Sequence, residues 1–212
     1  MDGNNRWSKK KGLNKFQSYS KGADNLIKLT SSIFKKTSVN YITAFALSSN
    51  NLNRSKNIID TILNILDLNI DKALTEKIKF SISIRGDHRF LSANLKKKIK
   101  HLELRSSSHK KKLIILINFS GRNDIIDTIN RINSSQKSIN TKNFYKYSIL
   151  SGIPDPDLLI RTGGYQRISD FLLFNISFTE LFFTKKLWPD LKYFDVERCI
   201  NQFKKIERKF GL

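Results

Sequence analysis

The hydrophobic residues of this chain follow two patterns, which take turns along the sequence. Between residues 54 and 70 they recur every three or four positions, as on one face of an amphipathic helix. Between residues 113 and 117 they form an unbroken run, which is typical of a buried strand. The same criteria predict helices over residues 22–36, 54–70, 91–104, 122–132, 142–150, 168–178 and 194–210. They predict strands over residues 41–47, 80–85, 113–117, 158–160 and 180–183.

Strands separated by helices indicate an α/β fold, with a mostly parallel β-sheet flanked by helices on both faces. The 212 residues contain no linker and no internal repeat, so we expect residues 1–212 to form a single domain. Ligands of such sheets bind beyond the carboxyl ends of the strands. Polar clusters follow four of the predicted strands, at residues 48–51, 86–87, 118–122 and from 161 onward. We therefore expect the functional site at this edge of the sheet.

The formal net charge is +21, which is compatible with a nucleic-acid, anionic-lipid or phosphorylated partner. The chain is also crowded with Lys, Asn, Ile and Ser, the bias of an AT-rich coding sequence, which favours solvated lysines over selection for nucleic acid. We find no aromatic or basic readout motif and expect no nucleic-acid partner. No apolar run is long enough to span a bilayer. The single cysteine, Cys199, fits a reducing cytoplasm.

Residues 157–169 carry the densest set of anion-binding groups. A short apolar strand leads Arg161 into a glycine turn, and Arg167 and Ser169 follow as the chain re-enters regular structure. Two guanidinium groups, a hydroxyl and free backbone N–H groups suit a diphosphate.

A second set opens the chain. Asp2 offers a carboxylate, Gly3 permits close approach, and Arg6 opens the helix-like stretch 6–9, whose free N–H groups would form an anion cradle. A carboxylate beside a diphosphate binds Mg²⁺ well. The segment is equally compatible with an ordinary turn. Two anion sites at opposite ends of one small chain suggest an enzyme that joins two phosphorylated substrates.

Two weaker features have alternatives. Residues 48–54 could form a binding loop or merely the loop that precedes a helix. Glu180 lies in an apolar run, where a buried acid must be paired or metal-bound, although it could also face water at an edge.

These blocks resemble the signature blocks of cis-prenyltransferases, and most closely the bacterial undecaprenyl diphosphate synthase type. They occur in the same order over essentially the whole chain, at residues 1–7, 48–54, 118–122, 157–169, 180–183 and 187–190.

The resemblance implies a cis-prenyltransferase-like fold with an apolar product tunnel, lined by the predicted helices 54–70 and 91–104. It implies Mg²⁺-dependent condensation of isopentenyl diphosphate with an allylic diphosphate, commonly farnesyl diphosphate. The product would be a long cis-polyprenyl diphosphate, the precursor of the lipid carrier for cell-wall glycan synthesis. The resemblance further implies a cytoplasmic homodimer, with peripheral membrane contact through its lipid product.

The resemblance also assigns roles. Asp2 would hold Mg²⁺, and Glu180 would complete the metal and substrate site, reaching toward the partner subunit. Asn51, with Ser48, would lie near the proton-removal step. The predicted allylic diphosphate site comprises Gly3, Asn4, Arg6 and Arg54, with Trp7 nearby. The predicted isopentenyl diphosphate site comprises Arg161, Arg167 and Ser169. The remaining substrate-binding positions are Asn5, Lys15, Tyr19, Ser49, Asn50, Leu52 and Ile168.

The chain departs from the family pattern at several of these positions. Lys15 replaces an arginine, which keeps the charge but loses the bidentate fork, and Tyr19 replaces a histidine. Asn50 and Leu52 stand where the Ser-Ser loop usually carries a glutamate and a tryptophan, and Gln166 stands for a frequent histidine. A non-catalytic homologue that keeps the fold and the dimer surface is the alternative reading.

The start of the sequence is a further departure. The family normally has an apolar strand just before the Met-Asp-Gly-Asn block, whereas this sequence begins at Met1. We expect this N-terminal strand to be missing, unless the natural start lies upstream. A free α-amino cation beside Asp2 would also disfavour the metal.

Overall fold

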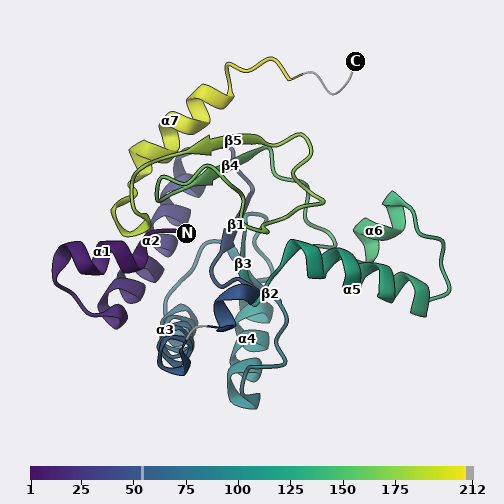
Figure 1. Cartoon of the computed structure of the whole chain (residues 1–212), viewed down its shortest axis with the longest axis horizontal. Coiled ribbons are helices and arrows are strands. Elements are labelled where there is room, and N and C mark those ends of the chain that lie inside the picture. Colours follow the sequence, from purple (N-terminus) through teal and green to yellow (C-terminus); the bar gives the residue numbers. More distant parts are fainter. Residues whose placement is uncertain (54, 209–212) are drawn as a thin grey trace.

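A computed structural model describes residues 1–53 and 55–208 (Figure 1). Arg54, predicted to bind the allylic diphosphate, lies outside the described residues. The α-helices are α1 (Asn4–Lys11), α2 (Lys15–Lys36), α3 (Lys56–Thr75), α4 (Ala93–Ser106), α5 (Gly121–Ser134), α6 (Thr141–Tyr147) and α7 (Tyr193–Phe203). The strands are β1 (Tyr41–Phe45), β2 (Ser81–Gly86), β3 (Lys112–Ile117), β4 (Leu158–Arg161) and β5 (Glu180–Phe183). Short 3₁₀ helices are η1 (Ser49–Asn53) and η2 (Trp188–Asp190).

All described strand pairs are parallel, as the sequence predicts. The strands form a three-stranded sheet in the order β1-β3-β2 and a separate pair, β4-β5. Within the pair, Leu158 lies opposite Glu180 and Arg161 lies opposite Phe183. The carboxyl end of β4 therefore delivers Arg161, while Glu180 begins β5 at the other end.

Side chains of β3 point alternately into two cores. Leu113 and Ile117 join a large core with α2, α3, α4 and α7, whereas Ile114 and Leu116 face a smaller one. The smaller core is covered by the turn after α6 and by residues 171–176. The sheet is thus buried on both faces, which explains the unbroken apolar run of β3.

The helix predicted over residues 168–178 is wrong. Ser169, Asp170 and Leu172 have φ angles of 51°, 64° and 44°, in the left-handed region that a right-handed helix excludes. The segment instead forms an irregular connection between β4 and β5. Arg167 and Ser169 therefore lie on this loop rather than at the start of a helix.

Asp170 fixes this loop to the start of α5. Its carboxylate accepts hydrogen bonds from Ser120 Oγ at 2.5 Å and from the Arg122 N–H at 3.1 Å. An acidic side chain at a helix N-terminus satisfies unpaired N–H groups and interacts favourably with the helix dipole. This contact spans about fifty positions, so local periodicity does not reveal it.

The other predicted helices and strands are present, with shifted ends. Asn14 and Gln17 form a capping box that starts α2 earlier than the apolar pattern indicates. The closing helix α7 ends at Phe203 rather than at 210. The first regular element of the described chain is α1.

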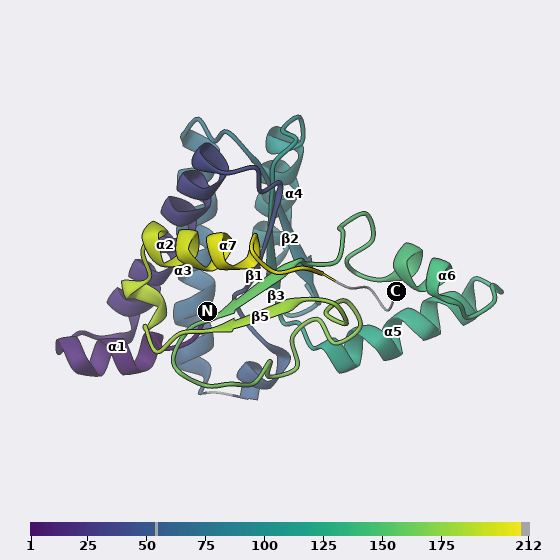
Figure 2. The same cartoon turned by 90° about the horizontal axis from the view of Figure 1, so that it is seen from above.

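Helix α1 and the α5-α6 hairpin lie at opposite edges of the molecule. Both views place α1 at one edge and α5 and α6 at the other, while α2 runs from α1 into the large core (Figures 1 and 2). Helix α7 passes over the β4-β5 pair, which it contacts through β4. No helix within the described residues is long and apolar enough to cross a membrane.

Candidate active site

The start of the chain is held between the carboxyl ends of β1 and β4. The Asp2 N–H donates to Thr162 Oγ1 at 2.9 Å, and this hydroxyl donates to the Asp2 carbonyl at 3.0 Å. The Trp188 N–H donates to the same carbonyl at 3.0 Å. The Met1 amino group lies 3.5 Å from the Phe45 carbonyl. The backbone of Asp2 is thus held by Thr162 and Trp188, independently of its carboxylate.

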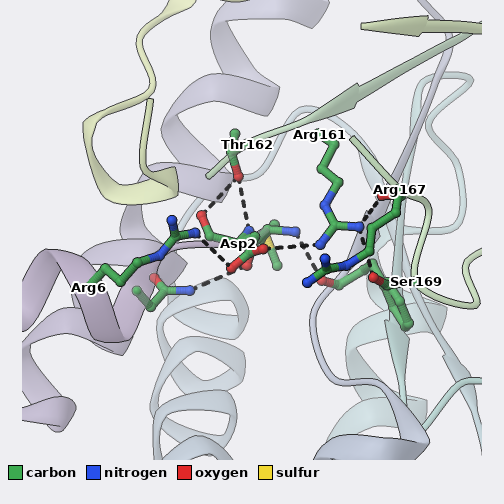
Figure 3. Close-up of polar contacts among 9 residues, drawn as sticks. Asp2, Arg6, Arg161, Thr162, Arg167 and Ser169 are labelled. Atoms are coloured by element: carbon green, nitrogen blue, oxygen red, sulfur yellow. Dashed lines mark hydrogen bonds and ion pairs between the residues drawn. The ribbon is translucent and has the colours of Figure 1, made fainter. Parts of the chain in front are cut away.

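The two predicted anion sites meet at the Asp2 carboxylate (Figure 3). Arg161 Nη2 lies 3.2 Å from Oδ2, and Arg6 Nη2 lies 3.5 Å from Oδ1. Arg161 Nη1 donates to Ser169 Oγ at 2.8 Å and also to the Arg167 carbonyl. Residues more than 150 positions apart therefore form one polar cluster, with Arg161 at its centre.

The glycine turn has a different use from the one predicted. The Gly163 N–H donates to the Lys186 carbonyl at 2.7 Å, and the Gly164 N–H donates to the Thr184 carbonyl at 2.9 Å. These two N–H groups are therefore not free for phosphate. Gly163 has a φ of +90°, and a Cβ there would lie 2.6 Å from Arg6 Nη2. The glycine allows α1 to approach the turn closely.

Hydrogen bonds connect α1 to neighbouring elements, and two of them involve the predicted residues Trp7 and Tyr19. Trp7 is only 8% exposed and donates from its indole N–H to Asp190 Oδ1 at 2.8 Å. Buried Ser18 donates to the Asn4 carbonyl at 2.6 Å, and the Tyr19 hydroxyl donates to Asn5 Oδ1 at 3.2 Å. Trp7 thus ties α1 to η2, while Ser18 and Tyr19 tie the start of α1 to α2.

Gly3 and Asn4 are tightly enclosed. Gly3 has a φ of +107°, and a Cβ there would meet the Leu187 side chain at 2.8 Å. The Oδ1 atom of Asn4 is buried and has no hydrogen-bond partner among the described residues. A side chain at Gly3 would thus clash with Leu187, and Asn4 Oδ1 is left available to a donor.

The Ser-Ser loop lies at the predicted edge of the sheet. Ser48 bridges to Phe119, and the Ser49 N–H donates to the Phe119 carbonyl at 2.9 Å. Asn50 is exposed and Asn51 is half-buried in η1, directly after β1. Leu52 is partly buried and packs against the large core.

Two further predicted positions, Lys15 and Ile168, lie outside the polar cluster around Asp2. Lys15 is the exposed first residue of α2, and Ile168 is half-buried on the loop between β4 and β5. Neither contributes a polar contact to the cluster in Figure 3.

The structure does not bring Glu180 to Asp2 within one chain. Glu180 begins β5 opposite Leu158, three positions before the partner of Arg161. At about 3.3 Å per residue, the offset along the strand is about 10 Å. Within this chain Glu180 therefore lies away from the Asp2 carboxylate.

A magnesium ion fits Asp2 only together with a substrate. Among the described residues no group of three or more His, Cys, Asp or Glu side chains could hold a metal ion. Mg²⁺ is, however, commonly bound through one or two carboxylates plus phosphate oxygens and water. Asp2 therefore suits an ion that arrives with a diphosphate, rather than a preformed protein cage.

Positive charge dominates the cluster. The guanidinium groups of Arg6 and Arg161 contact the Asp2 carboxylate, and that of Arg167 lies over the nearby Tyr165 ring. Burial lowers the pKa of the Met1 amino group to about 6, against the opposing effect of Asp2. The remaining charge favours a polyanionic ligand.

Two residues of this cluster were missed from the sequence. Thr162 is 2% exposed and is hydrogen-bonded to the Asp2 backbone. In the sequence, only its position between Arg161 and Gly163 indicated a place in the site. The Tyr165 ring lies against the three arginines, and nothing in the pattern of the sequence marks it.

This α/β fold is that of the prenyltransferases. Residues 1–211 match the prenyltransferase family model for undecaprenyl diphosphate synthases. The isoprenyl transferases of Fusobacterium nucleatum and Thermotoga maritima are 35% and 33% identical to the chain; the alignments cover all of this chain and 93% and 94% of those proteins. The crystal structure of lavandulyl diphosphate synthase from Lavandula x intermedia, in complex with dimethylallyl diphosphate, superimposes with a TM-score of 0.90 at 28% identity and covers 100% of this chain and 95% of that one. The chain belongs to the undecaprenyl diphosphate synthase family of isoprenyl transferases.

Proposed function

We propose that this prenyltransferase condenses isopentenyl diphosphate with an allylic diphosphate, with farnesyl diphosphate as primer. The product would be a long cis-polyprenyl diphosphate, a precursor of the lipid carrier for cell-wall glycan synthesis. One observation carries the proposal: Arg6 and Arg161 converge on the Asp2 carboxylate, with Arg167 and Ser169 in the same cluster. Such a cluster can hold two diphosphates side by side.

The two diphosphates would occupy different sides of Asp2. The allylic diphosphate would bind Arg6 and the first turn of α1, where Gly3, Asn4 and Asn5 lie. The isopentenyl diphosphate would bind Arg161, Arg167 and Ser169. As the isopentenyl double bond attacks, the allylic carbon–oxygen bond breaks, and the diphosphate leaves with the electron pair. The guanidinium groups stabilise the departing charge, and holding both substrates together orients them for attack.

The remaining steps would use the edge of the sheet and the helices. Loss of a proton gives the new double bond, and Asn51 with Ser48 would lie near this step, beside the end of β1. Bound at Asp2, Mg²⁺ would neutralise the charge of the diphosphate. The half-buried apolar side chains of α3 would line a tunnel for the growing chain together with α4. Their partial burial leaves apolar surface for a lipid.

Incorporation of labelled isopentenyl diphosphate into butanol-extractable lipid tests this function. Farnesyl diphosphate and Mg²⁺ should both be required, and chromatography of the dephosphorylated product gives its chain length. Omission of each substrate is the control. A folded protein that forms no product under these conditions would instead be the non-catalytic homologue.

We also propose a homodimer in which Glu180 serves the partner's site. Glu180 lies about 10 Å along β5 from the Arg161 end, and Leu181 and Phe183 of the same strand are 44% and 37% exposed. Exposed apolar side chains on an edge strand favour pairing with another chain.

Mixing two inactive variants tests this arrangement. Asp2→Ala and Glu180→Ala should each be inactive alone, whereas exchange of subunits should restore about a quarter of the turnover, since one site of each mixed dimer is intact. If the mixture stays inactive although sedimentation shows that subunits exchange, the role of Glu180 in the partner's site is wrong.

We propose a cytoplasmic protein that contacts anionic membranes peripherally through the turn between α1 and α2. Leu13 and Phe16 are 37% and 45% exposed there, and exposed lysines 9–11 precede them. Exposed apolar side chains beside lysines suit an anionic lipid surface, where each lysine contributes about 1 kcal/mol. The free thiol of Cys199 fits a reducing compartment.

Sedimentation with phosphatidylglycerol vesicles tests the membrane contact. Changing lysines 9–11 to glutamate should abolish binding. The control changes Lys96, Lys97 and Lys100 of α4, which are also exposed, to glutamate. This alters the net charge by the same amount but should reduce vesicle binding less. Equal losses would show that only net charge matters and would reject the proposed surface.

A further inference from the structure

Three guanidinium groups surround the ring of Tyr165. The Cζ atoms of Arg167, Arg6 and Arg161 lie 4.2, 4.9 and 5.9 Å from the ring centroid. These arginines come from three different elements: the loop after β4, α1, and the end of β4 itself. Tyr165 is 43% exposed, so core packing does not explain its position. The ring is therefore part of the arginine cluster.

The cluster needs such a group because its positive charges repel one another. Asp2 is ion-paired with Arg6 and Arg161, but Arg167 is not paired with it. The face of an aromatic ring attracts cations within about 6 Å of its centroid and carries no net charge. A tyrosine can thus hold guanidinium groups together without competing with a diphosphate, as another carboxylate would.

Tyr165 also touches both proposed diphosphate sites. Arg6 belongs to the allylic set, whereas Arg161 and Arg167 belong to the isopentenyl set. We propose that Tyr165 is a positioning residue, whose ring preorganises the guanidinium groups of both sites for diphosphate. This inference rests on the proposed function for the identity of the two sites. Preorganisation raises affinity because less freedom is lost when the ligand binds.

The test compares two replacements of Tyr165. Tyr165→Phe keeps the ring and should bind inorganic diphosphate, measured by titration calorimetry, within about twofold of the natural chain. Tyr165→Leu removes the ring and should weaken this binding about threefold to tenfold. In turnover, Leu should raise the KM for both substrates by similar factors and change kcat less. The melting temperature should stay the same, because the side chain is exposed.

A matched control is Tyr147→Leu, since Tyr147 also lies near a cation, Lys146, at 5.8 Å, but at the end of α6. This variant should bind diphosphate normally. The inference is overturned if Tyr165→Leu binds as the natural chain does, if Phe is as damaging as Leu, or if only one KM rises. A natural chain that binds diphosphate but makes no product would reject the proposed reaction, while the binding series would still decide the role of Tyr165.

Discussion

Asp2→Ala is expected to lower turnover by about 10²- to 10³-fold, the usual effect of removing one group that stabilises charge in a transition state. The variant loses the carboxylate that would hold Mg²⁺ and the anchor of Arg6 and Arg161. The fold should persist, because Thr162 and Trp188 bind the backbone of Asp2. Steady-state turnover across a range of Mg²⁺ concentrations and thermal unfolding by circular dichroism are the measurements.

Two companion variants sharpen this result. Asp2→Asn keeps an oxygen for Arg161 but removes the charge, so it should be nearly as inactive as alanine if a metal or charge balance matters. Asp24→Ala removes an exposed carboxylate of α2, paired with Lys72 at 3.7 Å, and should leave turnover unchanged. Near-normal turnover of Asp2→Ala would refute the assignment of Asp2 to the metal.

The elements of this fold were predictable because each is encoded locally. The continuous apolar run of β3 reflects burial on both faces of the strand, and the spaced isoleucines of α3 reflect burial on one face of the helix. The loop after β4 was not predictable in this way. Its apolar residues imitate a helix, but the contact of Asp170 with Ser120 and Arg122 holds the chain in left-handed conformations. A tertiary contact overrides the local pattern there.

The candidate site also has parts that the local sequence predicts and parts that depend on tertiary contacts. The sequence predicted Asp2, Arg6 and Arg161 as site residues from their residue types and from their places after strands or at a helix start, and the structure brings the three together. How they interact was not identified, because the ion pair of Arg161 with Asp2 joins residues 159 positions apart. For the same reason the glycine N–H groups appeared free, although carbonyls after β5 accept from them.

Arg161→Ala is expected to raise the KM for isopentenyl diphosphate by about 10- to 100-fold, as for loss of one or two hydrogen bonds to a charged group. The KM for the allylic substrate should rise less, since Arg6 and α1 remain. Arg161 is nonetheless central: its side chain is 13% exposed and contacts both Ser169 and Asp2. We therefore expect kcat to fall as well, because Asp2 loses its closer arginine. Initial rates with each substrate varied separately measure both effects.

Arg161→Lys separates charge from geometry. Lysine keeps the positive charge but cannot contact Asp2 and Ser169 through a planar fork, so it should recover only part of the affinity. Arg167→Ala provides the comparison, because Arg167 contributes its carbonyl to Arg161 and its guanidinium to Tyr165 but has no ion pair with Asp2. It should raise the KM for isopentenyl diphosphate with a smaller loss of kcat. Equal effects of Arg161→Ala on both substrates would contradict the division into two diphosphate sites and would indicate one shared anion site around Asp2.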